Sequence, residues 1–78
     1  MAVMWEARAA AGRLEELVAA VDRAADPSAR LFRADRPDPR VVLIDPTGRG
    51  VRVPAELLAR EPHVWAFDEV TRAPAEPG

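Results

Sequence analysis

The 78-residue chain contains no cysteine, lysine, asparagine, glutamine or tyrosine. Without cysteine it has no disulfide, no thiolate nucleophile and no thiolate metal site. The absence of lysine excludes a Schiff base and a P-loop lysine, and the absence of the other three types excludes a phenolic acid and a side-chain amide for an oxyanion hole. The single histidine, His63, excludes histidine-rich metal sites. Few of the groups on which side-chain catalysis depends are therefore present.

An excess of positive charge is also missing. All 11 basic residues are arginine, 13 residues are acidic, and the formal net charge is −2. This balance argues against a nucleic acid or an anionic membrane surface as partner. The absent residue types are mostly those with AT-rich codons, which indicates a GC-rich bacterial gene.

Long apolar segments are absent too. The N-terminus reaches an acid at Glu6 with no basic region before it, unlike a signal peptide. The longest aliphatic run, 41–44, is far too short to span a membrane. We therefore expect a cytoplasmic protein. With 49% hydrophobic and 31% charged residues, the composition is that of a globular domain.

The first half of the chain shows a change in hydrophobic period. Residues 2–8 alternate in the manner of a strand, with Val3, Trp5 and Ala7 on one face and the more polar set on the other. Apolar residues then recur at helical spacing, which predicts a helix near 12–25. Residues 29–34 and 40–45 predict two further strands. The second of these is apolar on both faces, as is typical of a central strand.

The second half predicts one more helix and one more strand. A short helix is expected over 54–60, because proline suits a first helical position and Leu57 and Leu58 supply a buried side. Residues 63–70 alternate again and predict the fourth strand. We expect a single domain over 1–70, followed by a flexible C-terminal tail at 71–78.

The predicted order is β-α-β-β-α-β, which is typical of an α+β, ferredoxin-like fold. Such a fold has a four-stranded antiparallel sheet with two helices on one face. The other face would be apolar in part, because 41–44 is apolar on both sides and Met4 and Trp5 point in opposite directions. Since monomers avoid sizeable exposed apolar patches, we expect a homodimer formed through that face.

Two stretches of the chain, 7–18 (ARAAAGRLEELV) and 31–44 (LFRADRPDPRVVLI), carry a family resemblance. They resemble the dimeric α/β-barrel superfamily, in particular its antibiotic-biosynthesis-monooxygenase-like members. The first stretch is similar to that family's first strand, Pro-Gly-Lys turn and first helix, with alanine in place of the proline, and the second resembles the strand-turn-strand that follows. The second half departs from the pattern: it lacks a Trp-Glu-Asp-like motif, and its second helix is short. The resemblance implies two sheets packed face to face as a barrel.

Five residues are candidates for a functional site. Histidine titrates nearest to neutral pH, so His63 is the candidate general acid or base; the alternative is a solvated residue at the start of a strand. Four aromatic residues are candidates to bind a small aromatic or apolar ligand, the alternative being core and dimer face: Trp5, Phe32, Trp65 and Phe67. We expect no metal and no cofactor.

Two functions fit these observations. The first is a homodimeric binding or accessory module, because no catalytic constellation emerges from the residues. The second, implied by the resemblance alone, is a cofactor-free monooxygenase- or cyclase-like enzyme acting on an aromatic polyketide-type substrate. A closed pocket lined by Trp5, Trp65 and His63 would favour the enzyme. A filled interface between helices and sheet would favour the module.

Overall fold

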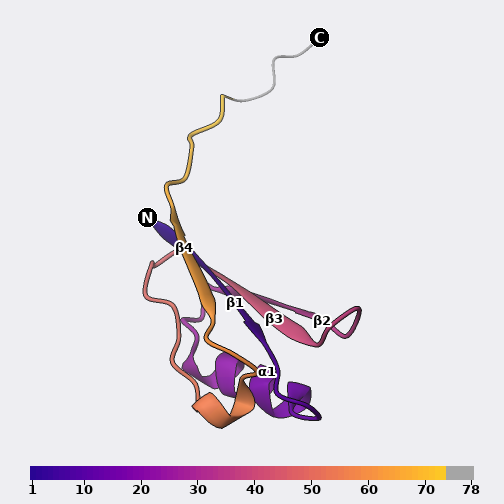
Figure 1. The fold of residues 1–78 in the computed structure, drawn as a ribbon. Helices are drawn as coiled ribbons and strands as arrows, with labels where there is room; N and C mark the ends of the chain where they lie inside the picture. The colour runs from indigo at the N-terminus through magenta and orange to yellow at the C-terminus, as the bar shows by residue number, and fades with distance from the viewer. Residues whose placement is uncertain (74–78) are drawn as a thin grey trace.

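The computed structural model describes residues 1–73, in which a single α-helix packs against a four-stranded sheet (Figure 1). The elements are, in chain order, β1 (Ala2–Arg8), α1 (Leu14–Ala24), β2 (Arg30–Ala34), β3 (Arg40–Asp45), the 3-10 turn η1 (Ala55–Leu57) and β4 (His63–Phe67). The predicted helix near 12–25 and the strands over 2–8, 29–34 and 40–45 are confirmed to within two residues. No helix in this part of the chain is long and apolar enough to cross a membrane.

The sheet has the strand order β2-β3-β1-β4, and each pair of neighbours is antiparallel. β1 and β3 therefore occupy the centre, as the apolar character of 40–45 predicts. The helix α1 connects β1 to β2 while β3 lies between them, which is the split β-α-β arrangement. This strand order makes the α+β domain compatible with a ferredoxin-like fold.

The prediction of a second helix over 54–60 is wrong, and so is the expectation of two helices on one face. Residues 55–57 form only a 3-10 turn. Backbone groups that a helix would bond internally are instead bonded to the end of β1: Ala10 N–H donates to the Leu57 carbonyl at 2.8 Å, and Ala59 N–H donates to the Arg8 carbonyl at 2.9 Å. The Leu58 backbone is accordingly extended.

The fourth strand is confirmed but ends earlier than predicted, at Phe67 instead of residue 70. The reason lies in the pairing with β1, because Phe67 is opposite Ala2, the first residue of that strand. Residues 71–73 carry no helix or strand and are exposed. The rest of the predicted tail, 74–78, lies outside the described residues.

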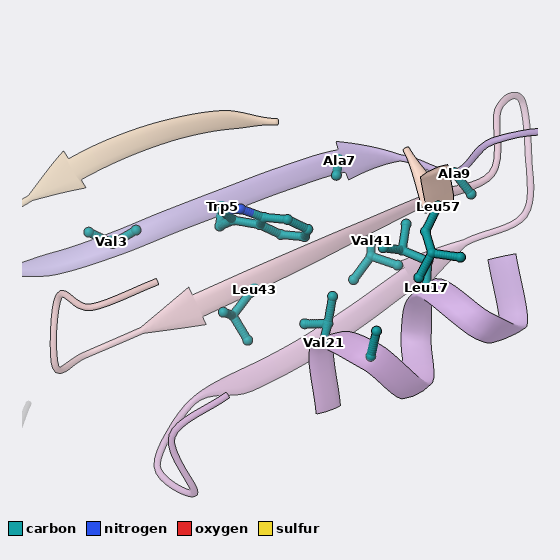
Figure 2. Close-up of a cluster of buried hydrophobic side chains, with 10 residues drawn as sticks. Val3, Trp5, Ala7, Ala9, Leu17, Val21, Val41, Leu43 and Leu57 are labelled. Atoms are coloured by element: carbon teal, nitrogen blue, oxygen red, sulfur yellow. The ribbon is translucent and has the colours of Figure 1, made fainter. Parts of the chain in front are cut away.

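The core lies between α1 and one face of the two central strands (Figure 2). Burial alternates along β1 and β3, as expected for strands with one covered face. Leu17 and Val21, on the apolar stripe of α1, are completely buried against this face. Acidic residues in the first turn and an arginine in the last suit the dipole of the helix. The buried hydrophobic residues are Val3, Trp5, Ala7, Ala9, Leu17, Ala20, Val21, Val41, Leu43 and Leu57.

Candidate functional site

Within residues 1–73, no helix or strand covers the sheet face opposite α1 (Figure 1). Residues directly opposite each other on antiparallel strands share a face, so the register identifies the side chains on this surface, which we call the open face. They are Arg30, Phe32 and Ala34 from β2, Arg40, Val42 and Ile44 from β3, Ala2, Met4, Glu6 and Arg8 from β1, and His63, Trp65 and Phe67 from β4.

Much of the open face is apolar. Ile44, Met4 and Trp65 form one row across three strands, because Met4 is opposite Ile44 on one side and Trp65 on the other. Phe32 and Phe67 extend the apolar surface toward the two edges of the sheet. Phe32 is 46% exposed, Trp65 40% and Phe67 51%. Large apolar side chains in contact with solvent across one sheet face are typical of an interaction surface.

One end of the open face is polar and holds His63. This histidine is opposite Glu6, whose Oε2 accepts a hydrogen bond from Arg40 Nη1 at 3.3 Å. The imidazole also packs edge-on against Trp65, with 5.5 Å between the ring centroids. A hollow of about 140 Å³ lies here and is lined by Glu6, Arg8, Arg40, Arg60, Glu61 and His63. The Nε of Arg40 is buried there without a hydrogen-bond partner among the described residues.

The structure separates the five residues that the sequence suggests for a site. Trp5 is on the covered face and is 2% exposed, so it belongs to the core. Phe32 lies on β2 at one edge of the sheet, whereas Trp65 and Phe67 lie on β4 at the other edge. Only His63, Trp65 and Phe67 share a strand face. A single chain therefore does not bring the four aromatic residues together.

A second feature, which the sequence reasoning missed, is a groove of about 490 Å³ on the α1 side of the sheet. It occupies the region in which a second helix had been expected. The one sequence signal that could have indicated this groove is the alternation of Val51, Arg52 and Val53, which form part of its lining. The groove is lined by Trp5, Val51, Arg52, Val53, Ala55, Leu58, Arg60, Glu61 and Pro62.

The buried carboxylate of Asp45 anchors the loop that leads into this groove. Its Oδ1 accepts hydrogen bonds from the Thr47 backbone N–H at 2.8 Å and the Thr47 hydroxyl at 2.6 Å, and its Oδ2 accepts one from Gly50 N–H at 2.8 Å. Gly48 and Gly50 have φ of 79° and 69°, which favours glycine at both positions. Burial acts to raise the pKa of Asp45, but the hydrogen bonds from Thr47 and Gly50 outweigh it and hold the pKa below its usual value.

We expect the change Asp45→Ala to lower the free energy of unfolding by about 2 kcal/mol, because it leaves buried donors of the loop unpaired. A carboxylate with a lowered pKa stabilises the fold above its unfolded-state pKa, and this contribution is lost as the pH falls through the folded-state pKa. The difference in the free energy of unfolding between the unaltered chain and Asp45→Ala should therefore be largest at pH 7 and become smaller below about pH 4. Urea denaturation at pH 7 and pH 3 measures both effects, and an equal difference at the two pH values would contradict the assignment.

Residues 1–73 contain no group of three or more histidine, aspartate or glutamate side chains that could hold a metal ion. Comparison with known proteins adds no relative: no family model, no curated protein and no solved structure matches the chain. The fold and the site together define a class, a small α+β domain with an uncovered and partly apolar sheet face.

Proposed function

We propose that the protein is a homodimeric binding module whose two copies associate through the open face. The observation that carries this proposal is the exposure of Phe32, Trp65 and Phe67 on one sheet face, around the central row that contains Met4 and Ile44. A chain with so small a core gains stability when this surface is removed from water.

The layout of the open face suits such an interface. Stable interfaces have an apolar centre with a polar rim and bury about 800 Å² on each partner. Here the row of Ile44, Met4 and Trp65 crosses the two central strands, and Glu6, Arg40 and His63 lie toward one end of the strands. Two sheets packed face to face, about a twofold axis parallel to the strands, would place the β2 edge of one copy over the β4 edge of the other. Phe32 would then approach the aromatic residues from which a single chain separates it.

Sedimentation velocity of the unaltered chain tests the dimer. We expect one species at twice the 8.5 kDa mass of the chain at micromolar concentration. Dilution should shift the backbone NMR signals of Met4, Ile44 and Trp65 and leave those of Leu17 and Val21 in place. A single 8.5 kDa species over the whole concentration range would overturn the proposal, and it would weaken the resemblance to the dimeric α/β-barrel superfamily.

The geometry supports the module better than the enzyme. The enzyme needs an enclosed cavity lined by Trp5, Trp65 and His63. In the described part of the chain, Trp5 contributes to the groove on the α1 side, whereas His63 and Trp65 lie on the open face. The interface between α1 and the sheet is filled by buried side chains that include Leu17 and Leu43 (Figure 2). Both observations match the arrangement expected of a binding module.

A further inference from the structure

The groove on the α1 side has the dimensions and the walls of a ligand site. Its volume of about 490 Å³ falls within the range of about 300–1,000 Å³ that is typical of small-molecule pockets. The walls are mainly apolar, from Val51, Val53, Ala55, Leu58 and Pro62, and Trp5 of the core also contributes. Pockets of this kind use apolar surface for affinity and a few polar groups for orientation.

The space exists because no helix covers this part of the sheet. α1 packs against β3 and the turn η1, and the segment 58–59 is held to the end of β1 by backbone hydrogen bonds. Val64 of β4, which faces the same side as Trp5, is consequently 58% exposed. The other wall is held in place by the Asp45 loop, which fixes the position at which the segment 51–53 starts. The groove is therefore built by backbone and buried contacts on both sides.

The charges at the groove favour an anion. Arg52 and Arg60 both line it, both are exposed, and neither forms an ion pair within residues 1–73. Other arginines, such as Arg33 and Arg40, are paired with carboxylates. Glu61 is the one acidic residue in the lining, so two cations face one carboxylate. An anionic group on a ligand would complement this difference.

We propose that the groove binds an anionic amphiphile, a molecule with one carboxylate and an apolar chain or ring system of medium size. The apolar part would contact Val51, Val53 and Leu58, and the carboxylate would lie near the guanidinium groups of Arg52 and Arg60. This inference rests on the proposed role as a binding module and names its ligand class. Arg60 and Glu61 line both this groove and the hollow beside His63, whereas Arg52 and Ala55 line only the groove, so variants of Arg52 and Ala55 test the ligand separately from the dimer.

Titration with decanoate, followed by calorimetry and by backbone NMR, tests the ligand class. We expect saturable binding with the largest shifts at Val51, Val53 and Leu58, and binding of decyltrimethylammonium at least tenfold weaker. Arg52→Gln and Arg60→Gln should each weaken decanoate binding about fivefold, as expected for exposed charge contacts. The matched control is Arg36→Gln, because Arg36 is an exposed arginine of the β2–β3 turn and lies outside the groove. The affinity of this variant for decanoate should equal that of the unaltered chain.

A second variant tests the position of the site. Ala55 is exposed in the turn η1, so Ala55→Phe should fold, which circular dichroism checks, and should abolish decanoate binding by filling the groove. Equal binding of the cationic amphiphile, shifts confined to Met4, Val42 and Trp65, or no binding at millimolar decanoate would each overturn the ligand proposal. A dimer that binds no decanoate contradicts only the ligand class, and a monomer that binds it contradicts only the dimer.

Discussion

Replacement of Trp65 by arginine is expected to weaken the dimer at least 100-fold and to leave a folded monomer. Trp65 is the largest side chain on the open face and lies next to Met4 in the apolar row. Tryptophans in interfaces are frequent hot spots, whose loss costs about 2 kcal/mol or more, and an arginine there would also place a charge against apolar surface. Sedimentation velocity measures the dissociation, and circular dichroism checks that the sheet persists.

The neighbouring residue provides the matched control. Val64 is also exposed and also on β4, but it faces the α1 side, since it is opposite Trp5. Val64→Arg should therefore leave the dimer intact, because its charge stays in water on the side away from the interface. If both variants dissociate the dimer equally, the two copies associate along the β4 edge and not through the open face. If neither does, the open face is not the interface.

Replacement of Trp5 by alanine is expected to unfold the chain. The indole is 2% exposed and is the largest side chain of the buried cluster on the α1 side of the sheet (Figure 2). Truncating a buried tryptophan costs about 3–5 kcal/mol. Small domains have total stabilities near the lower end of about 5–15 kcal/mol, so this loss removes most or all of the folding free energy. Urea denaturation and the dispersion of amide NMR signals measure the result.

The conservative change Trp5→Phe keeps an aromatic ring in the same position and should retain a cooperative unfolding transition at lower stability. This variant also distinguishes the loss of side-chain packing from a general sensitivity of β1 to substitution. A Trp5→Ala protein with a transition close to that of the unaltered chain would contradict the placement of Trp5 in the core. It would indicate that the opposite face of β1 is the covered one.

Elements defined by local patterns could be predicted from the sequence. α1 has an apolar stripe through Leu14, Leu17 and Val21, and the Asp26-Pro27 pair after it prevents continuation of the helix. β1 alternates between its two faces, and β3 is apolar from Val41 to Ile44. The length of β4 was less predictable, because it depends on where β1 begins and so on how much backbone is available for pairing.

Contacts between distant segments could not be predicted in the same way. The segment 54–60 has local features of a helix, but its backbone bonds to the end of β1, which is about fifty residues earlier in the chain. The groove forms because segment 54–60 bonds to β1 and does not form a helix, and because the Asp45 loop positions the opposite wall. No local sequence motif indicates either arrangement. Of the candidate site, the sequence could suggest that His63 and Trp65 share a strand face, and it could not show that Phe32 lies at the opposite edge.

By itself the sequence determined the α+β class, the alternation of each strand and the position of the long helix, because these follow from hydrophobic period and from turn residues close in the chain. Only the tertiary structure decided which of the two alternating sets of side chains on each strand is buried on the α1 side of the sheet. The register pairs Met4 with Trp65 and Trp5 with Val64, which places the two tryptophans on opposite faces of the sheet. A shift of one residue would exchange those faces, and the packing of α1 against β3 and the burial of Trp5, Val41 and Leu43 in one core select between them.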